Sequence, residues 1–549
     1  MFITIYYYIV GFCCNSNSSN SSSNSNSSFS SSNNNSSSNS SSSNSYYKEL
    51  IIEREEMKII RSFSSQVGGG LSQFGGVHGT RTTPGNAKLW RSKPLLRREG
   101  DKVFKTGTEA ANLLLNEAIR REDVSSTPFV SQWSLLSQSL AVVFDRMPKY
   151  AWIMKQLLEP ERSITFRVAW IDDSGVSRVN RGYRIQYSSA LGPYEGGLAF
   201  SPRVNLSLLK AAALDTTFRN ALSHKALGGA FGGADFNPYT KSETEIQRFC
   251  QSYMTELAKY IGPDTDLPGL GEGVTNVEIG YMYGQYKRIN HHCGQVGKGL
   301  MWGGSPVHVK AHGYGIAYFA KKMLEDKGQS LEGKKCIITG SHYVALALAE
   351  KLLQFGAIPL TFSDPSGFVY EPNGFDAGKL KTIEKLKNER GASVGRYIIA
   401  STSAKFNEPS PNIFDIPCDF VFTTSAALPI TENDISSLAS KGCKGIIEGG
   451  GLGALTTDGL AAAKKRSMLL APARATSVGA VIFNGMEMEA DPLKPGETID
   501  SRVEAATDIV FEEVKRTAKE FNTRGDLHVG ANIAAFLKVA DAMFLHGSV

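Results

Sequence analysis

A glycine-rich turn that begins Gly340-Ser341-His342 and ends at Ala345 contains the first residues whose types and spacing could do chemistry. It follows a short apolar run, Lys335–Thr339. A G-x-G-x-x-A turn between a strand and a helix binds the pyrophosphate of a dinucleotide, because its second glycine lets the backbone approach the phosphates. Here His342 replaces that glycine, and its imidazole takes the space of the ligand. The turn therefore indicates a dinucleotide-type fold with a damaged cofactor site.

Other residues of cofactor-binding or metal-binding type are scattered. Asp364 lies twenty-four residues after Gly340, where an acid can face a cofactor ribose, and an ordinary turn acid is the equal alternative. His291, His292 and Cys293 are adjacent, and adjacent side chains rarely converge on one ion, so a solvated turn is favoured. Seven cysteines without a C-x-x-C pair indicate neither a disulfide framework nor a zinc site. We predict no metal site.

Strands and helices alternate after Ser305. A helical pattern at Val344–Phe355 ends at Gly356, and apolar runs of strand length recur before and after it. Such alternation predicts a doubly wound parallel sheet, a Rossmann-type domain over residues 306–485. The strand-like runs are 335–339, 358–362 (ending at Ser363-Asp364), 420–422, 445–447 and 468–471.

Residues 99–305 show a mixed pattern of helical and alternating spacing, which predicts a mixed α/β first domain. Two amphipathic helices, 503–521 and 532–546, close the chain. The other predicted elements are a helical region from 107 to about 161, a strand at 164–171, a turn at 172–175, a second strand ending at Tyr187, and helices at 206–221 and 242–261.

Composition and charge exclude several classes of protein. The chain has 549 residues, 41% apolar and 20% charged, which is ordinary globular composition and enough for two or more domains. Its net charge of +6 arises at the front, because residues 1–56 carry −2 and residues 57–98 carry +8, leaving 99–549 neutral. A neutral body disfavours a nucleic-acid binder. No apolar stretch approaches the ~20 residues that span a bilayer, so we predict no membrane span.

Two segments precede the predicted domains. Residues 15–45 are all Ser or Asn except Phe29, so low-complexity disorder is expected over 1–56. Residues 57–98 contain eight Lys or Arg and no acid, the composition of a transit peptide, and a mitochondrial matrix destination is predicted. A basic tail that is never cleaved is the alternative. Met57 is a candidate initiator, which would make 1–56 an artefact of the gene model.

Five stretches of the body are recognisable: FRVAWIDD (166–173), VNRGYRIQYSSALGPYEGGLAFSP (179–202), RFCQSYMTELAKYIGPDTDLP (248–268), EIGYMYGQYKR (278–288) and GANIAAFLKVADAM (530–543). They resemble the hexameric, NADP-type glutamate dehydrogenases of the Glu/Leu/Phe/Val dehydrogenase family, and the resemblance covers about 125–549. It implies a first domain with substrate and hexamer contacts, a Rossmann domain for NADP, and C-terminal helices (486–549) returning to the first domain. Active members reductively aminate 2-oxoglutarate with ammonia and NADPH.

By this resemblance the substrate positions of the chain are substituted. Glu195 stands where the family has a lysine that grips a substrate carboxylate, and a negative charge there repels the substrate. Phe231 replaces the catalytic lysine, and Gly271 replaces the aspartate that shuttles protons. Arg219 keeps the charge of a substrate-binding lysine, although its planar fork differs from an ammonium. Asn484 replaces a serine that binds the distal carboxylate and can still donate a hydrogen bond.

The resemblance also marks a candidate rescue residue and further losses. Glu272, beside Gly271, could replace the proton shuttle, although a slip of one residue usually points a side chain elsewhere. His312 stands at a nicotinamide-side threonine, His308 at an arginine, and Ala426-Ala427-Leu428 at a Thr-Gln-Asn stretch. These changes remove polar contacts or shape. The histidines of the cofactor cleft are expected to fill it, with an anion or metal site as the alternative.

These substitutions predict a mitochondrial pseudoenzyme, a glutamate dehydrogenase fold kept as a structural or assembly subunit. We expect no cofactor, or NADP if any. The expected partners are copies of the chain in a hexamer-like assembly, or a larger mitochondrial complex. Two alternatives stay open: an active, divergent NADP-dependent glutamate dehydrogenase that uses Arg219 and Glu272, and a sensor whose altered cleft binds another small molecule.

Overall fold

The computed structural model describes residues 107–547 apart from 110, 113–115, 117–127, 291–307, 409–411, 425–427, 489–493 and 496, all within the compact unit Arg98–Val549. The predictions for residues 1–106, for His291-His292-Cys293 and for Ala426-Ala427 lie outside the described residues. The side chain of His308 is likewise outside them.

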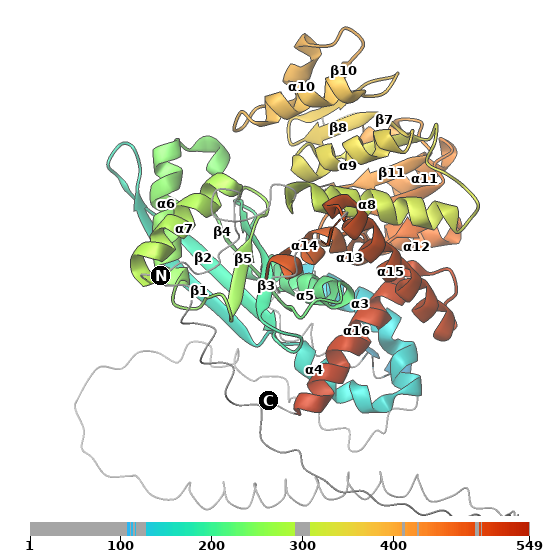
Figure 1. Cartoon of the computed structure of the whole chain (residues 1–549), viewed down its shortest axis with the longest axis horizontal. Helices are drawn as coiled ribbons and strands as arrows, with labels where there is room; N and C mark the ends of the chain where they lie inside the picture. The colour runs from blue at the N-terminus through green and yellow to red at the C-terminus, as the bar shows by residue number, and fades with distance from the viewer. Residues whose placement is uncertain are drawn as a thin grey trace, which may run out of the picture. The chain divides into compact units, whose positions relative to one another are not determined.

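The first sheet has five strands in the order β1-β2-β4-β3-β5 (Figure 1). β1 and β2 form an antiparallel hairpin, whereas β3 pairs parallel with β4 and β5. Successive residues of a strand face opposite sides, so Leu198 and Phe200 pack in one apolar cluster and Ala199 in another. The elements are α3 (Pro128–Arg146), α4 (Ala151–Leu157), β1 (Arg162–Ile171), β2 (Ser177–Ser188), β3 (Tyr194–Phe200), α5 (Leu206–Leu222), β4 (Gly228–Ala234), α6 (Glu243–Leu257), β5 (Asp266–Gly269) and α7 (Asn276–Asn290).

The second sheet is parallel, in the order β13-β12-β11-β6-β7. Because β7 and β11 lie on opposite sides of β6, the winding reverses direction there. A small antiparallel sheet, β10-β9-β8, branches from it. The elements are α8 (His308–Glu325), β6 (Lys335–Thr339), α9 (Tyr343–Gln354), β7 (Ile358–Pro359), β8 (Thr361–Asp364), β9 (Gly367–Tyr370), α10 (Ala377–Lys387), β10 (Lys405–Asn407), β11 (Phe420–Thr423), α11 (Glu432–Ser440), β12 (Gly445–Glu448), α12 (Thr457–Lys465), β13 (Leu469–Ala471), α13 (Ala473–Thr476), α14 (Val478–Met488), α15 (Ile499–Glu520) and α16 (Leu527–His546).

The last helices return to the first half of the described chain. α15 packs on α8, and α16 packs on α5, α3 and α4 (Figure 1). Arg474 of α13 strengthens the connection, because its buried guanidinium donates to Asp215 of α5 at 2.7 Å and to Gln132 of α3 at 2.8 Å. The predicted fold class, a mixed α/β domain followed by a Rossmann-type domain with returning helices, is confirmed.

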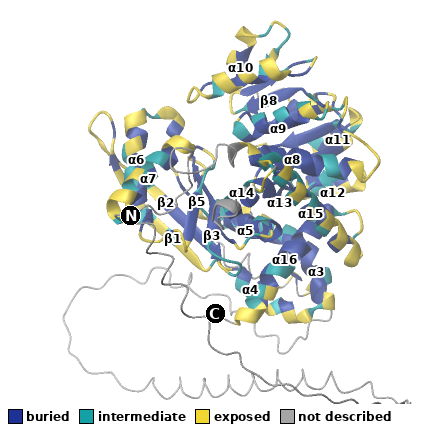
Figure 2. Ribbon diagram, in the orientation of Figure 1, coloured by how far each residue is buried: buried dark blue, intermediate teal, exposed yellow. Residues whose placement is uncertain are grey.

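Burial differs sharply between neighbouring strands of the first sheet (Figure 2). Every residue of β3 is buried, as is the second half of β2, whereas β1 at the sheet edge alternates and is mostly exposed. Helix α16 is the one described helix long and apolar enough to cross a membrane, and half of its apolar window is buried inside the protein. The sequence analysis had identified no such stretch.

Several predicted elements need correction. The strand expected at 358–362 is two strands, because the chain leaves the second sheet after Pro359 and enters the small sheet at Thr361. The helix expected over 242–261 ends at Leu257. Strands β3, β4 and β5 were not predicted. In β4 the reason is its glycine-rich sequence, which lacks the residues that favour strands. The domain boundaries at 305 and 485 stay predictions.

Candidate functional site

Glu195 lies at the centre of the predicted substrate site, in β3, and only 5% of it is exposed. Its carboxylate accepts two hydrogen bonds from side-chain amides. Asn220 of α5 donates to one oxygen at 2.9 Å, and Asn484 of α14 donates to the other at 2.7 Å. A buried carboxylate requires such donors, because it has lost its water. The structure thus brings Glu195 and Asn484, two predicted site residues, into direct contact.

A second charged group lies beneath Glu195. Arg184 and Asp266 form an ion pair with both side chains fully buried, and the guanidinium Nε donates to the carboxylate at 2.9 Å. Arg184 also donates to the carbonyls of Gly196 and Gly197, at 3.1 and 3.2 Å, directly after Glu195 in β3. The pair therefore fixes the strand that carries Glu195, and Arg184 interacts electrostatically with its carboxylate.

Phe231 and Gly271, which stand where the resemblance places a catalytic lysine and aspartate, differ in their packing. Phe231 of β4 is half-buried, and its ring lies against Gly197, where an added Cβ would be 3.2 Å from the ring. Gly271 has no room for a side chain, because a Cβ there would lie 2.1 Å from the carbonyl oxygen of Leu198. Aspartate cannot occupy position 271 on this backbone without a shift of the chain.

The two predicted compensating residues do not meet. Glu272 is 54% exposed, and its carboxylate pairs with the exposed Arg203 at 2.9 Å. Arg219, near the end of α5, is half-buried, and its Nε has no hydrogen-bond partner among the described residues. It interacts electrostatically with Tyr343. Arg219 therefore keeps a positive charge at the predicted site, whereas Glu272 is engaged at the surface.

His342 is the N-cap of α9, at the carboxyl end of β6. Its Nδ1 accepts a hydrogen bond from the backbone N–H of Val344 at 3.3 Å, which assigns the proton to Nε2. Nε2 donates to the carbonyl of Thr424 at 2.9 Å, just after β11. Although His342 is an exposed residue, desolvation of its ring by the surrounding groups lowers the pKa of the imidazole.

This histidine bridges the point where the winding of the second sheet reverses, between β6 and β11. Doubly wound sheets bind dinucleotides there, with the phosphates on free N–H groups of the helix N-terminus. Here the imidazole of His342 accepts a hydrogen bond from the N–H of Val344. Gly340, with a φ of +92°, turns the chain directly before Ser341, and Ser341 is buried. The N–H of Val344, one of the groups that a phosphate would meet, is therefore engaged within the protein.

The remaining cofactor candidates are also engaged within the protein. His312 of α8 has its Nε2 2.9 Å from the carbonyl of Gly449, which follows β12. Asp364 accepts from the backbone N–H groups of Ser366 and Val394, at 3.0 and 2.7 Å, and pairs with Lys387 at 3.2 Å. Asp364 thus has partners within its own turn, and a role toward a cofactor ribose stays a prediction.

Several residues around the site were missed by the sequence analysis. Asn220 directly follows Arg219. A buried Glu195 needs hydrogen-bond donors, and that requirement could have identified Asn220 as one of them. Glu278 of α7 is buried and pairs at 2.6 Å with Arg390, which follows α10. No local signal predicts that pair, because its residues are distant in sequence. It joins the first sheet's helices to the region of the second.

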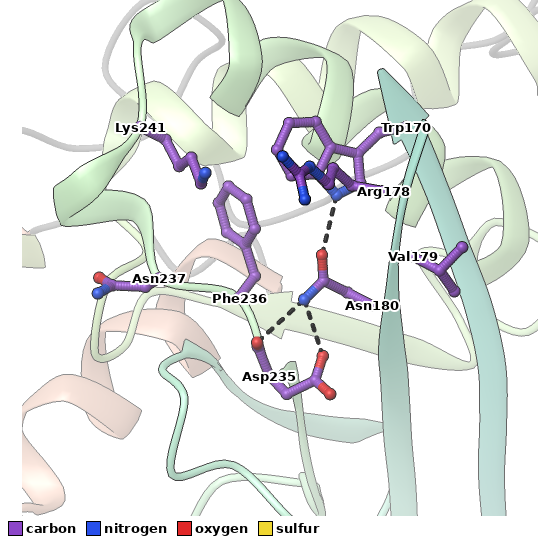
Figure 3. Close-up of a pocket in the computed structure, with 8 residues that line it drawn as sticks. All are labelled: Trp170, Arg178, Val179, Asn180, Asp235, Phe236, Asn237 and Lys241. Carbon is purple, nitrogen blue, oxygen red and sulfur yellow. Dashed lines mark hydrogen bonds between the residues drawn. The ribbon is translucent and has the colours of Figure 1, made fainter. Parts of the chain in front are cut away.

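The described residues form no metal-binding group, and the pocket of Figure 3 contains no predicted site residue. Among the described residues, no group of three or more His, Cys, Asp or Glu could hold a metal ion. The pocket, about 380 Å³ in volume, lies beside the β1–β2 hairpin, and Figure 3 shows Asn180 bridging Trp170 and Asp235. It is lined by Trp170, Arg178, Val179, Asn180, Asp235, Phe236, Asn237 and Lys241, none of which is a predicted site residue.

Comparison with known proteins gives consistent matches. Residues 160–288 match the Glu/Leu/Phe/Val dehydrogenase dimerisation domain, and 303–547 match the Glutamate/Leucine/Phenylalanine/Valine dehydrogenase family. NADP-specific glutamate dehydrogenases of Chlorella sorokiniana and Giardia intestinalis are each 39% identical, over 79% and 78% of this chain and 84% and 97% of theirs. The glutamate dehydrogenase structure of Plasmodium falciparum is similar with a TM-score of 0.76 and 35% identity, over 83% of this chain and 98% of that one.

We expect Glu195→Ala to lower the free energy of unfolding by about 1–3 kcal/mol, because it removes the acceptor of two buried amide hydrogen bonds. Urea unfolding followed by circular dichroism measures the change. Glu272→Ala, which removes an exposed carboxylate, is the matched control and should change stability by no more than ~0.5 kcal/mol. Equal effects of the two variants would contradict the role assigned to Glu195.

Proposed function

The chain belongs to the Glu/Leu/Phe/Val dehydrogenase family, and we propose that it is a catalytically inactive, glutamate dehydrogenase-like member that serves as a structural or assembly subunit in the mitochondrial matrix. One observation carries the proposal: the buried carboxylate of Glu195 is held by Asn220 and Asn484. In the enzymes that the chain resembles, the residues at the positions of Glu195 and Asn484 bind substrate carboxylates. Here a carboxylate of the chain itself takes their place.

Charge and packing both oppose substrate binding. A second carboxylate placed about 4 Å from Glu195 would be repelled by about 4 kcal/mol at the effective dielectric of a protein site. The amide of Asn484, at the position of the family's carboxylate-binding serine, is already engaged by Glu195. A substrate therefore meets like charge and occupied donors at the same place.

The chemical step lacks its acid–base groups. Phe231 can neither polarise a carbonyl nor change charge, and position 271 is closed to any side chain on this backbone. Loss of one acid–base group typically lowers the rate by ~10²–10⁴, although such losses are not additive within one catalytic unit. Nothing at Phe231 or Gly271 supplies replacement chemistry.

The cofactor side supports the same proposal. The relatives named above are NADP-specific, and a chain with this fold would be expected to take NADP if any dinucleotide. His342 instead caps the helix whose N–H groups would receive the phosphates, and its ring is tied to Thr424. We therefore propose that the chain uses no cofactor.

One observation favours the alternative of an active, divergent NADP-dependent glutamate dehydrogenase. Arg219 retains a cation at a substrate-binding position, and within the described part of the chain its buried Nε has no hydrogen-bond partner. The alternative also requires Glu272 as the proton shuttle, and the ion pair of Glu272 with Arg203 at the surface weighs against it.

The edge of the first sheet supports the assembly role. Among the described residues, β1 has β2 as its one strand partner; on its other edge the carbonyls of Ala169 and Ile171 accept hydrogen bonds from Ser252 and Arg248 of α6, and no strand covers the rest of that edge. The hairpin also exposes the apolar side chains of Ile171, Val176 and Val179, and Val179 lines the pocket of Figure 3. The matching family domain is described as a dimerisation domain. We propose that copies of the chain, or a larger mitochondrial complex, cover this surface.

The purified full-length chain should not oxidise NADPH or NADH detectably with 2-oxoglutarate and ammonium, measured by absorbance at saturating substrates. Phe231→Lys alone should stay inactive, because position 271 still lacks a proton shuttle. Turnover by the wild type that disappears in Glu272→Gln would contradict the proposal and establish the active alternative.

A C-terminally tagged chain should be found in mitochondria, begin within Gln66–Arg98, and have the native mass of an oligomer or a larger complex. Val179→Asp should reduce that mass, because it places a charge in the proposed contact surface. Ile509→Asp, on the exposed face of α15, is the matched control and should leave it unchanged. A cytosolic monomer that keeps its N-terminal Ser/Asn tract would contradict both the location and the assembly.

A further inference from the structure

Two buried cysteines lie opposite each other at the amino edge of the second sheet, the edge opposite His342. Phe420 of β11 pairs with Gly445 of β12 in parallel register. Cys418 and Cys443 each precede this pair by two residues, in the segments that lead into the two strands. Both pack in the apolar cluster that contains Val421 and Ile446, so they lie on the same side of the sheet.

Burial and hydrogen bonding agree with this placement. Cys418 and Cys443 belong to one apolar cluster, which also contains Val421 and Ile446 of the same two strands. The backbone ladder continues toward the cysteines, because the N–H of Lys444 donates to the carbonyl of residue 419 at 2.7 Å. The two thiols are therefore held side by side by the sheet itself.

The spacing suits a covalent bond between the two sulfurs. Adjacent strands are about 4.7–4.9 Å apart, and disulfides join residues whose Cα atoms lie about 4.4–6.8 Å apart. The thiols interact: a hydrogen bond from Cys418 lowers the pKa of Cys443, and the Cys443 thiol in turn donates to the carbonyl of Gly445 at 3.4 Å. A thiolate is the nucleophile in oxidation.

We propose that Cys418 and Cys443 are a redox-modification site that forms a reversible disulfide with hydrogen peroxide as the oxidant. The Cys443 thiolate attacks one peroxide oxygen, the O–O bond breaks, and a sulfenic acid forms as the other oxygen leaves as water after protonation. The Cys418 sulfur then attacks the sulfenic sulfur, and its thiol proton leaves with the hydroxyl as a second water. Two thiols are oxidised, and one peroxide is reduced to two waters.

A third cysteine on the same sheet provides the internal control. Cys336 of β6 lies opposite Phe420 on its other side, and its thiol donates to the carbonyl of Lys334 at 3.5 Å. It is fully buried, whereas Cys418 and Cys443 are 6% and 7% exposed. All three thiols are buried, so Cys336 tests whether oxidation depends on the pairing of Cys418 with Cys443.

The test is peptide mapping of the reduced, full-length chain after treatment with hydrogen peroxide. Trypsin cleaves after Lys405, Lys441 and Lys444, which separates the two cysteines into peptides 406–441 and 442–444. We expect these peptides joined, with a mass about 2 Da below their sum because two hydrogens are lost, and released by dithiothreitol. In denaturant, the oxidised chain should then have five alkylatable thiols of its seven.

The variants make the assignment specific. Cys418→Ala and Cys443→Ala should each abolish the joined peptide, whereas Cys336→Ala should leave its yield unchanged. Circular dichroism of each variant checks that it is folded. The proposal is overturned if folded wild type gives only sulfinic or sulfonic acid on single cysteines, or if Cys336 is the residue joined to either thiol.

Discussion

The burial of one carboxylate constrains the whole site. Glu195 has been removed from water, and a charge in that situation is stable only with hydrogen-bond donors around it. Its donors come from two helices far apart in sequence, α5 and α14, so the carboxylate joins the first sheet to the end of the Rossmann-type region. The ion pair of Arg184 and Asp266 beneath it fixes the strand. Glu195 therefore has two effects on the site. Its negative charge would repel a substrate carboxylate, and its hydrogen bonds bring α5 and α14 together at β3.

The substrate and cofactor sides follow the same physical rule. In each, a side chain of the protein uses the polar groups that a ligand would otherwise meet. Glu195 engages the amides of Asn220 and Asn484, while His342 engages the helix N-terminus and the carbonyl of Thr424. Hydrogen-bonded polar groups cost less free energy to bury than unpaired ones, whereas an empty polar cleft would remain hydrated. This arrangement supports a fold kept for its surfaces.

Local patterns predicted the elements well and their partners poorly. The strand at Lys335–Thr339 agrees residue for residue, because a short apolar run bounded by a glycine turn is a local signal. The break after Pro359 was missed, since which sheet a strand joins depends on tertiary pairing. Likewise Glu195 was recognised as a substituted position, but its contact with Asn484, 289 residues away, has no signature in the sequence. The same applies to the closed space at Gly271.

The most direct test of the central claim is thermal unfolding of the full-length chain with 2-oxoglutarate and NADPH, added singly and together. A ligand present at 100 times its Kd stabilises a fold by ~2.7 kcal/mol, which is readily seen as a rise in Tm. If Glu195 and His342 occupy the two halves of the cleft, Tm stays constant at millimolar concentrations of both compounds. A saturable rise in Tm with either compound would contradict the account.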